Sequence, residues 1–188
     1  MISSKKELKE WLEYEHLNPK NLWEVVWMNE KQVIRKHQKL LRKTEYYLNT
    51  HKKFRSLWYR FRLSRCQLKH HLSIPPNTCG KGLHILHVGS ILINKNAKVG
   101  ENCAFHINTA LVAGGNTNVA PVLGNHVIMG VGSSVVGGVT VADNVVIGAG
   151  AVVVKDVLES DISVGGVPAK KISNNSSTGW SAENRKKQ

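Results

Sequence analysis

The chain of 188 residues carries 26 Lys and Arg against 13 Asp and Glu, a formal net charge of +13. The length fits one domain or one domain with a small appendage. The three cysteines, Cys66, Cys79 and Cys103, are odd in number and include no CxxC pair, which argues against a disulfide framework and a zinc knuckle. Without an apolar signal core or a run of about 18 apolar residues, the sequence predicts a cytoplasmic protein with reduced thiols.

Residues 1–72 are predicted to form a basic helical region. A short first helix, 3–16, has two serines at its start as candidate caps and ends before Pro19. A longer second helix is expected over about 21–48, and a third helix over 51–69.

Positive charge is concentrated in this helical region. Between Lys31 and Lys69 there are 13 basic residues and one acidic residue, Glu45. Such a face favours an anionic partner, although a solvated helix surface explains it equally well. The aromatics among the arginines of 54–62 are interpreted first as helix packing. A basic amphipathic helix on the inner face of an anionic membrane is the next interpretation, and nucleic acid is not favoured because no recognised motif supports it.

A repeat of six residues organises the second half of the chain. Ten apolar residues stand six apart in two runs separated by one break: Ile93, Val99, Phe105 and Leu111, then Leu123, Met129, Val135, Val141, Ile147 and Val153. A period of six is neither helical nor that of a simple strand. It predicts a solenoid with three flat faces and about 18 residues per coil, in which stacked coils share one core.

Small residues often follow the apolar ones, and we expect them to let the chain turn each corner: Gly100, Gly124, Gly130, Ala142 and Gly148. The prolines in 73–77 end the helical region and start the solenoid. The break at 113–121 is expected to be a loop that leaves it. The predicted organisation is a helical region at 1–72, a solenoid at 73–173, and a polar, disordered tail at 174–188.

Two stretches, Ile74–Asn94 and Val164–Ile172, resemble the serine acetyltransferase family of hexapeptide-repeat acyltransferases, in the short form found among polysaccharide O-acetyltransferases. The resemblance covers about 70–173 and implies a left-handed parallel β-helix, a hand that contradicts the usual crossover rule and comes from the resemblance alone. It also implies acetyl-coenzyme A as acyl donor, no metal, and a homotrimer with active sites between adjacent solenoids.

The family places its catalytic histidine at His87. This residue stands six before Ile93, so we expect it in an inward slot where an aliphatic residue belongs. An imidazole suits the chemistry, because a hydroxyl must lose a proton as it attacks a thioester carbonyl. His106 is a second catalytic candidate, expected to point out of its own coil toward a neighbouring subunit. His84 and His126 are expected to be surface residues.

The sequence departs from the family at two positions. Leu72 stands where serine acetyltransferases carry the aspartate that orients the histidine, and Ala120 stands where they carry a second histidine before a proline. Serine is therefore in doubt as the acceptor. His87 also needs another orienting group, for which a backbone carbonyl and His84 are the options.

The resemblance also implies a coenzyme A site. Gly114 and Gly115 in the break would let backbone amides approach the acyl group, and backbone around Gly132, Ser133, Gly150 and Ala151 would line the pantetheine arm. The Gly-x-Pro-Ala-Lys sequence closes the solenoid in the family. Near the coenzyme the resemblance places Lys155, Pro168, Ala169, Lys170 and Lys171, with the lysines available to phosphates.

These observations predict an acetyl-coenzyme A-dependent O-acetyltransferase with His87 as general base. The expected acceptor is a sugar hydroxyl of a surface polysaccharide or its precursor, because the basic helices suit an anionic lipid-linked substrate. Serine is the alternative acceptor. Two other functions remain open: a non-catalytic trimeric scaffold, and a γ-type carbonic anhydrase with His87, His106 and His126 as zinc ligands, although their spacing does not resemble that family.

Overall fold

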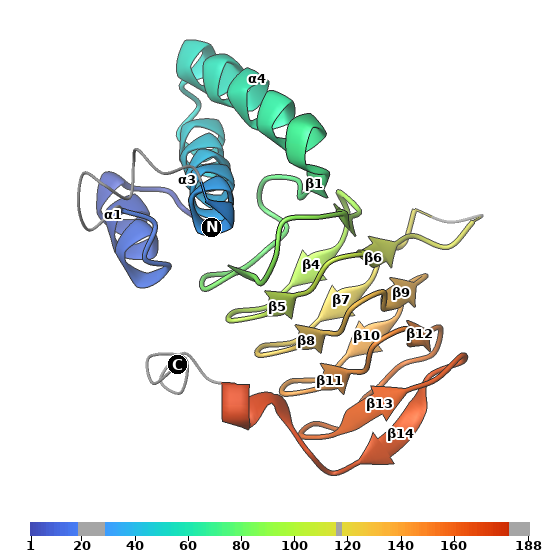
Figure 1. Ribbon diagram of the computed structural model, residues 1–188. Coiled ribbons are helices and arrows are strands. Elements are labelled where there is room, and N and C mark those ends of the chain that lie inside the picture. Colours follow the sequence, from blue (N-terminus) through green and yellow to red (C-terminus); the bar gives the residue numbers. More distant parts are fainter. Residues whose placement is uncertain (19–28, 116–117, 181–188) are drawn as a thin grey trace.

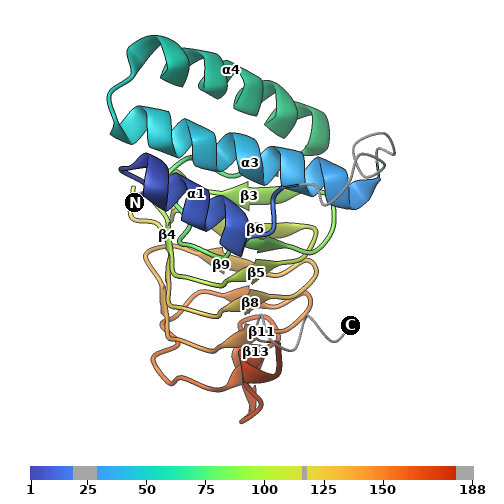
Figure 2. The ribbon, with the colours of Figure 1, turned by 90° about the vertical axis from the view of Figure 1, so that its left-hand side faces the viewer.

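The computed structural model describes residues 1–18, 29–115 and 118–180. Three α-helices come first along the chain: α1 (Lys5–Tyr14), α3 (Glu30–Asn49) and α4 (Lys53–His70). They form a cap on one end of a solenoid of short strands (Figure 1). In the view turned by 90°, α4 is the outermost layer and α3 lies between α4 and the first coil (Figure 2). Among the described residues, no helix is both long and apolar enough to cross a bilayer.

Within the described residues, each of the three predicted helices has a counterpart, and the bounds differ. Ser4 caps α1: its hydroxyl accepts from the Glu7 amide, and the Glu7 carboxylate accepts from the Ser4 amide. The second predicted helix was to begin near residue 21, but α3 begins at Glu30, capped by Asn29. Residues 19–28 of that prediction lie outside the described residues.

The strands form three sheets, one for each face of the solenoid. Sheet A contains β1 (Leu72–Ser73), β3 (Ile91–Ile93), β6 (Thr109–Val112), β9 (Ser134–Val136) and β12 (Val152–Val153). Sheet B contains β4 (Lys98–Val99), β7 (Val122–Leu123) and β10 (Thr140–Val141). Sheet C contains β2 (His84–Ile85), β5 (Ala104–Phe105), β8 (Ile128–Met129), β11 (Val146–Ile147), β13 (Ser163–Gly165) and β14 (Lys170–Ser173). The pairings are parallel except that of β13 with β14, so the predicted β-helix is confirmed.

The register of the sheets follows the predicted coil length. Ser134 pairs with Val152, 18 residues later, and the same step separates Ile91 from Thr109. Across the predicted break the step is 24, as between Ala110 and Ser134, because residues 113–121 add six residues between β6 and β7.

The small residues after the apolar positions have a different purpose from the one expected. A side chain at Gly100 would place its Cβ 2.4 Å from the Gly124 oxygen, and at Gly130 2.7 Å from the Ala149 nitrogen. These glycines therefore allow neighbouring coils to approach closely. Turning is done by other residues with positive φ, such as Asn102, which adopts the left-handed conformation that Asn tolerates.

The repeated apolar residues fill one core that runs along the solenoid axis. Leu111, Met129, Val135 and Ile147 are fully buried, and the cluster continues upward through Leu72 into α3 and α4. The lower end is closed by the antiparallel β13–β14 pair. The helical cap and the solenoid thus share a hydrophobic core.

The region after β14 differs from the disordered tail expected at 174–188. Residues 177–180 form a 3-10 helix, η1 (Ser177–Trp180), and the Ser177 amide donates to the Asn144 carbonyl. The Ser163 hydroxyl donates to the Asn175 carbonyl. These hydrogen bonds hold residues 174–178 against the last coils, and residues 181–188 lie outside the described part.

Candidate functional site

His87 lies in the connection between β2 and β3, on the outer surface of the first coil. Its side chain is 59% exposed, so the predicted inward slot is wrong. The reason is local: Ile85 fills the core position, and the chain takes eight residues, not six, to reach Ile93. The register agrees, because His84 pairs with Ala104, 20 residues later. The two extra residues carry the imidazole outward, where a substrate can reach it.

The carboxylate of Glu30, the first residue of α3, lies beside this imidazole. Nδ1 of His87 is 3.4 Å from Glu30, whose Oε1 also accepts a 2.7 Å hydrogen bond from the Val88 amide. That amide hydrogen bond holds the pKa of Glu30 below its usual value. An ionised carboxylate facing Nδ1 favours the tautomer with its proton there, which leaves the Nε2 lone pair free to act as a base.

Glu30 is the orienting group that the sequence did not reveal. The options from sequence were a backbone carbonyl or His84, and the aspartate position of the family holds Leu72, which is fully buried in the core. The carboxylate comes instead from a helix 57 residues upstream. The sequence feature that could have drawn attention to Glu30 is its place next to Asn29, a residue type that often caps helices. By itself, an acidic residue after such a cap indicates only the start of a helix.

His106 lies next to His87 on the following coil. The two ring centroids are 6.3 Å apart, and both residues follow strands of sheet C. Burial lowers the pKa of His106, and the neighbouring His87 lowers it further, which favours the neutral ring. His106 was expected to reach toward another subunit. In this structure it is a neighbour of His87 within the same chain.

The two histidines belong to one edge of the solenoid, where each coil passes from sheet C to sheet A. We call this the histidine edge; it comprises 86–90, 106–108, 130–133 and 148–151. Its rungs are linked by hydrogen bonds from the Gly132 amide to the Ile107 carbonyl and from the Gly150 amide to the Val131 carbonyl. Four residues predicted to line the pantetheine arm therefore lie in line with His87: Gly132, Ser133, Gly150 and Ala151.

What these four residues can offer a ligand is limited by bonds within the chain. The amides of Ser133 and Ala151 donate to the carbonyls of Gly130 and Gly148, and the Ser133 hydroxyl also donates to Gly130. Ser133 and Ala151 are fully buried. Their predicted contact with pantetheine stays a prediction, and it depends on carbonyl oxygens and surface shape, since these amides already have acceptors.

Gly114, Gly115 and Lys155 lie on a different edge, where the chain leaves sheet A for sheet B. Around Gly115 there is open space, because a Cβ built on it meets no atom of the described residues within 4 Å. Within one chain, these residues are therefore on a different edge from His87.

The closing Gly-x-Pro-Ala-Lys sequence forms the turn between β13 and β14. The Ala169 amide donates to the Val152 carbonyl, which ties this turn to the last rung of sheet A. Lys155, Lys170 and Lys171 are exposed, as a phosphate-binding role requires. The ammonium of Lys171 is paired with Glu159, which reduces the charge that it offers a phosphate.

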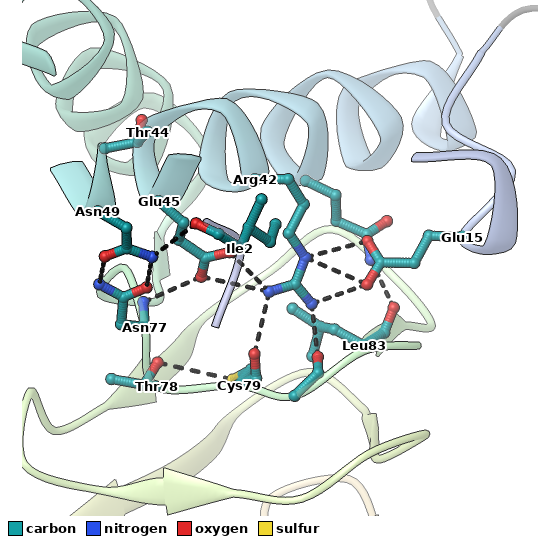
Figure 3. A network of polar contacts seen from close by, with 12 residues as sticks. Ile2, Glu15, Arg42, Thr44, Glu45, Asn49, Asn77, Thr78, Cys79 and Leu83 are labelled. Carbon is teal, nitrogen blue, oxygen red and sulfur yellow. Dashed lines mark hydrogen bonds and ion pairs between the residues drawn. The ribbon is translucent and has the colours of Figure 1, made fainter. Parts of the chain in front are cut away.

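A buried ion network fixes α3 above the first coil (Figure 3). Because Glu30 is the first residue of α3, the network also sets the position of Glu30. The fully buried guanidinium of Arg42 binds Glu15 at 2.7 Å and Glu45 at 3.0 Å, and donates to the carbonyls of Cys79 and Gly80. Burial alone lowers the pKa of Arg42, but the two carboxylates outweigh it and raise the pKa above its ordinary value. Nothing in the local sequence pattern indicated this network.

Further contacts extend the same junction. The amides of Gly82 and Asn77 donate to Glu15 and Glu45, so each carboxylate is bound to both Arg42 and the first coil. The side chain of Asn49, at the end of α3, exchanges hydrogen bonds with Asn77. The two ends of α3 are therefore held, one at Asn77 and the other at His87.

Other sites in the described part of the chain are weaker candidates. No group of three or more His, Cys, Asp and Glu is arranged there to hold a metal ion. Two surface pockets, of about 300 and 420 Å³, are lined by residues other than His87 and His106. Burial raises the pKa of the Cys79 and Cys103 thiols to about 12, so neither is a nucleophile at neutral pH.

Comparison with known proteins supports the same fold. No family model matches the chain. A serine acetyltransferase of Synechococcus elongatus is 36% identical over 100 residues, which are 52% of this chain and 41% of that protein. The match thus spans less than half of this curated relative.

Solved structures extend the likeness to most of the chain. The match to serine acetyltransferase from Brucella abortus covers 93% of this chain and 72% of that protein, with a TM-score of 0.68 and 21% identity. The complex of the same enzyme with coenzyme A has a TM-score of 0.69 and 21% identity, and the match covers 90% of this chain and 70% of that one. The Neisseria gonorrhoeae enzyme in complex with serine gives a TM-score of 0.65 at 23% identity, covering 88% and 69%. The chain is therefore similar over 100 residues to a serine acetyltransferase, and its fold is the left-handed β-helix of the solved structures.

Proposed function

We propose that this protein is an acetyl-coenzyme A-dependent O-acetyltransferase. The observation that carries the proposal is the exposed His87 imidazole, held through Nδ1 by the Glu30 carboxylate at the start of the histidine edge. The homologous serine acetyltransferase and a structural neighbour with bound coenzyme A support the reaction class and the donor.

The arrangement suits direct transfer in a ternary complex. Nε2 of His87 takes the proton of the acceptor hydroxyl as its oxygen attacks the thioester carbonyl. The new C–O bond forms, the C–S bond breaks, and the protonated imidazole returns its proton to the leaving thiolate. Glu30 keeps the ring oriented and stabilises the imidazolium that forms between these two transfers.

Serine is the acceptor that the comparisons favour, since the homologous protein is a serine acetyltransferase and a structural neighbour is a complex with serine. The polysaccharide sugar predicted from sequence is the second candidate. It is supported by Leu72, because this buried aliphatic residue stands where the serine enzymes carry their orienting carboxylate. The carboxylate in this chain enters from α3 instead, which changes the walls of the acceptor site.

The active enzyme in this proposal is a homotrimer with its sites between solenoids. An imidazole that is 59% exposed needs a second wall to keep water from the reacting thioester. Gly115, on another edge and open to solvent, is a residue that a neighbouring chain can bring to that wall.

The test is coenzyme A release from acetyl-coenzyme A with L-serine or with a panel of free and nucleotide-linked sugars as acceptor. Acceptor-dependent thiol release that disappears in His87→Ala supports the proposal, and the better acceptor decides between the candidates. His126→Asn is the matched control, because His126 has a left-handed conformation on a different edge and Asn tolerates it. Equal activity of wild type and His87→Ala with every accepted substrate would overturn the proposal.

A further inference from the structure

The outer face of α4 carries an apolar stripe, interrupted by Arg65 before its last member, that the described chain leaves uncovered. Its members are exposed large side chains: Phe54 at 92%, Leu57 at 67%, Trp58 at 58%, Phe61 at 55% and Leu68 at 76%. Isolated apolar side chains on a surface need no explanation, but a contiguous group on one helix face indicates an interaction site.

The spacing of these residues places them on one side of the helix. At about 100° per residue the five fall within an arc of about 100°. The buried residues of α4, Leu63 and Cys66, fall on the opposite side, where they join the core shared with α3 and the first coil. Most of the stripe therefore faces away from the rest of the molecule, of which α4 is the outermost layer (Figures 1 and 2). Leu68, at its end, also lines a surface pocket beside Ser73 and Leu92 of the first coil.

Positive charge surrounds this stripe. The helix contains six basic residues and no acidic one: Lys53, Arg55, Arg60, Arg62, Arg65 and Lys69. At the same angular spacing Arg55, Arg62 and Lys69 flank one side of the stripe and Lys53 and Arg60 the other. Arg65 falls within the stripe, with its guanidinium 5.7 Å from the centre of the Phe61 ring. Their long stems can lie along an apolar surface while their charged ends reach an anionic headgroup layer.

We propose that α4 docks this protein on anionic lipid bilayers, with the apolar stripe inserted at the headgroup boundary and the flanking basic residues on lipid phosphates. Charge complementarity selects this occupant. A second copy of the chain would bring six more positive charges to the same face, and two of the five stripe residues, Leu57 and Leu68, offer no stacking surface to nucleic-acid bases. The inference goes beyond the proposed transferase activity and does not depend on its acceptor.

Docking in this way fixes how the rest of the molecule stands. With α4 flat on the bilayer, the solenoid projects away from the membrane, because the helices cap one end of it (Figure 1). The first coil with His87 is then the coil nearest the lipid, and β14 is far from it.

The experiment is co-sedimentation of the full-length protein with vesicles of phosphatidylcholine alone or with about 30% phosphatidylglycerol. We expect binding to the anionic vesicles that persists at physiological salt and weakens as salt is raised. The triple variant Phe54→Ser/Trp58→Ser/Phe61→Ser should bind at least about tenfold less, because the buried apolar area is lost. The triple variant Arg55→Gln/Arg62→Gln/Lys69→Gln should lose most of its preference for anionic lipid.

Leu158→Ser/Val131→Ser is the matched control, since both side chains are exposed apolar residues of the solenoid, and it should bind vesicles as wild type does. Circular dichroism should show unchanged helix content in every variant, because all substituted side chains are exposed. The inference would be overturned if wild type did not bind anionic vesicles, or if the Phe54 triple variant bound them as strongly as wild type does. It would also be overturned if wild type bound no vesicles and light scattering showed a smaller assembly for the triple variant, since the stripe would then join copies of the chain. Binding of an oligonucleotide but not of vesicles would overturn it as well.

Discussion

At the scale of single residues, the site depends on how His87 and Glu30 are brought together from distant parts of the chain. The imidazole is on a connection that has two extra residues, and the carboxylate is at the first position of a helix whose other end is anchored on the same coil. The pair is half exposed, so its charge attraction is weak in water. Its value is therefore in orienting the ring and fixing its tautomer.

Glu30→Gln tests this orienting role. The amide oxygen of Gln can still accept from the Val88 amide, but the negative charge beside Nδ1 is lost. We expect kcat to fall at least about tenfold while KM for acetyl-coenzyme A changes little, because the base is weakened and the donor site is untouched.

Glu13→Gln is the control for this change, since Glu13 is an exposed acid of α1 that forms a surface ion pair with Lys9. It should leave both kinetic constants as in wild type. A Glu30→Gln variant with unaltered kcat, or with KM raised and kcat unaltered, would show that Glu30 only begins a helix.

His37 gives the protein an acid sensitivity of its own. This residue of α3 is fully buried, and burial, opposed by a backbone contact at Leu72, lowers its pKa to about 4. In the unfolded chain His37 binds a proton near pH 6.5, and in the folded chain it does so only near pH 4. The free energy of unfolding is therefore unaffected by His37 above pH 6.5 and declines as the pH falls toward 4. The difference of about 2.5 pKa units corresponds to roughly 3 kcal/mol.

Urea unfolding at pH 7 and pH 4.5 measures this loss. His37→Leu, which places an uncharged side chain of similar size in the core, should lose less stability over the same pH interval than wild type does. Equal losses in the two proteins would contradict a neutral, buried His37.

Of the residues in the site, His87 could be predicted from the sequence and Glu30 could not. His87 could be singled out because a histidine followed by a small residue and an apolar run is a local pattern. Glu30 and the Arg42 network could not, since they join residues tens of positions apart and an isolated acid in a helix has many explanations. The predicted inward position of His87 failed because two inserted residues do not interrupt the alternation of apolar residues near them.

At the scale of elements, α3 links the core to the site. Its Arg42 makes hydrogen bonds to Glu15 just after α1, to Glu45 of α3 itself and to two carbonyls of the first coil, and its side chain is fully buried. A buried ion network of this kind specifies one arrangement of the cap over the solenoid, since its members cannot be satisfied in another.

Arg42→Met should destabilise the protein by roughly 3 to 5 kcal/mol, because two carboxylates remain buried without a cation. Equilibrium unfolding in urea, followed by circular dichroism, measures the change. In the same variant kcat should fall, since α3 no longer holds Glu30 in place.

Arg62→Met is the matched control, since Arg62 is on the exposed side of α4, and its stability should stay within about 0.5 kcal/mol of wild type. If Arg42→Met were as stable as this control, the network would not be what fixes the helical cap.

The solenoid could be predicted from the sequence in part. The three faces and the coil length followed from the six-residue period, because each buried position recurs at the same place in every coil. The conformation of the corners could not be predicted, because the period shows where glycines stand but not why they are needed there. The glycines after the apolar residues allow neighbouring coils to stack closely, and Asn residues such as Asn102 make the turns.

At the scale of the whole molecule, the separation of the predicted site residues over two edges gives a direct test of assembly. In the proposed trimer, His87 of one chain works with the loop at Gly115 of the next. Gly115→Trp should fold normally, because its Cβ meets no described atom within 4 Å, and should be inactive as it blocks the neighbour's site.

Co-expression of His87→Ala with Gly115→Trp should then restore about a quarter of wild-type activity, since random mixing leaves that share of interfaces intact in a closed ring. Light scattering should report a mass of three chains. Absence of any restored activity would place the whole site in one chain.

The proposed role of His87 as the base that acts on the acceptor is tested most directly by one comparison: kcat and coenzyme A affinity of His87→Ala beside those of wild type. We expect kcat to fall at least about a hundredfold and the Kd for coenzyme A, measured by calorimetry, to stay unchanged, because only proton transfer is removed. A variant that turns over acceptor as fast as wild type, or that loses activity only because coenzyme A no longer binds, would contradict it.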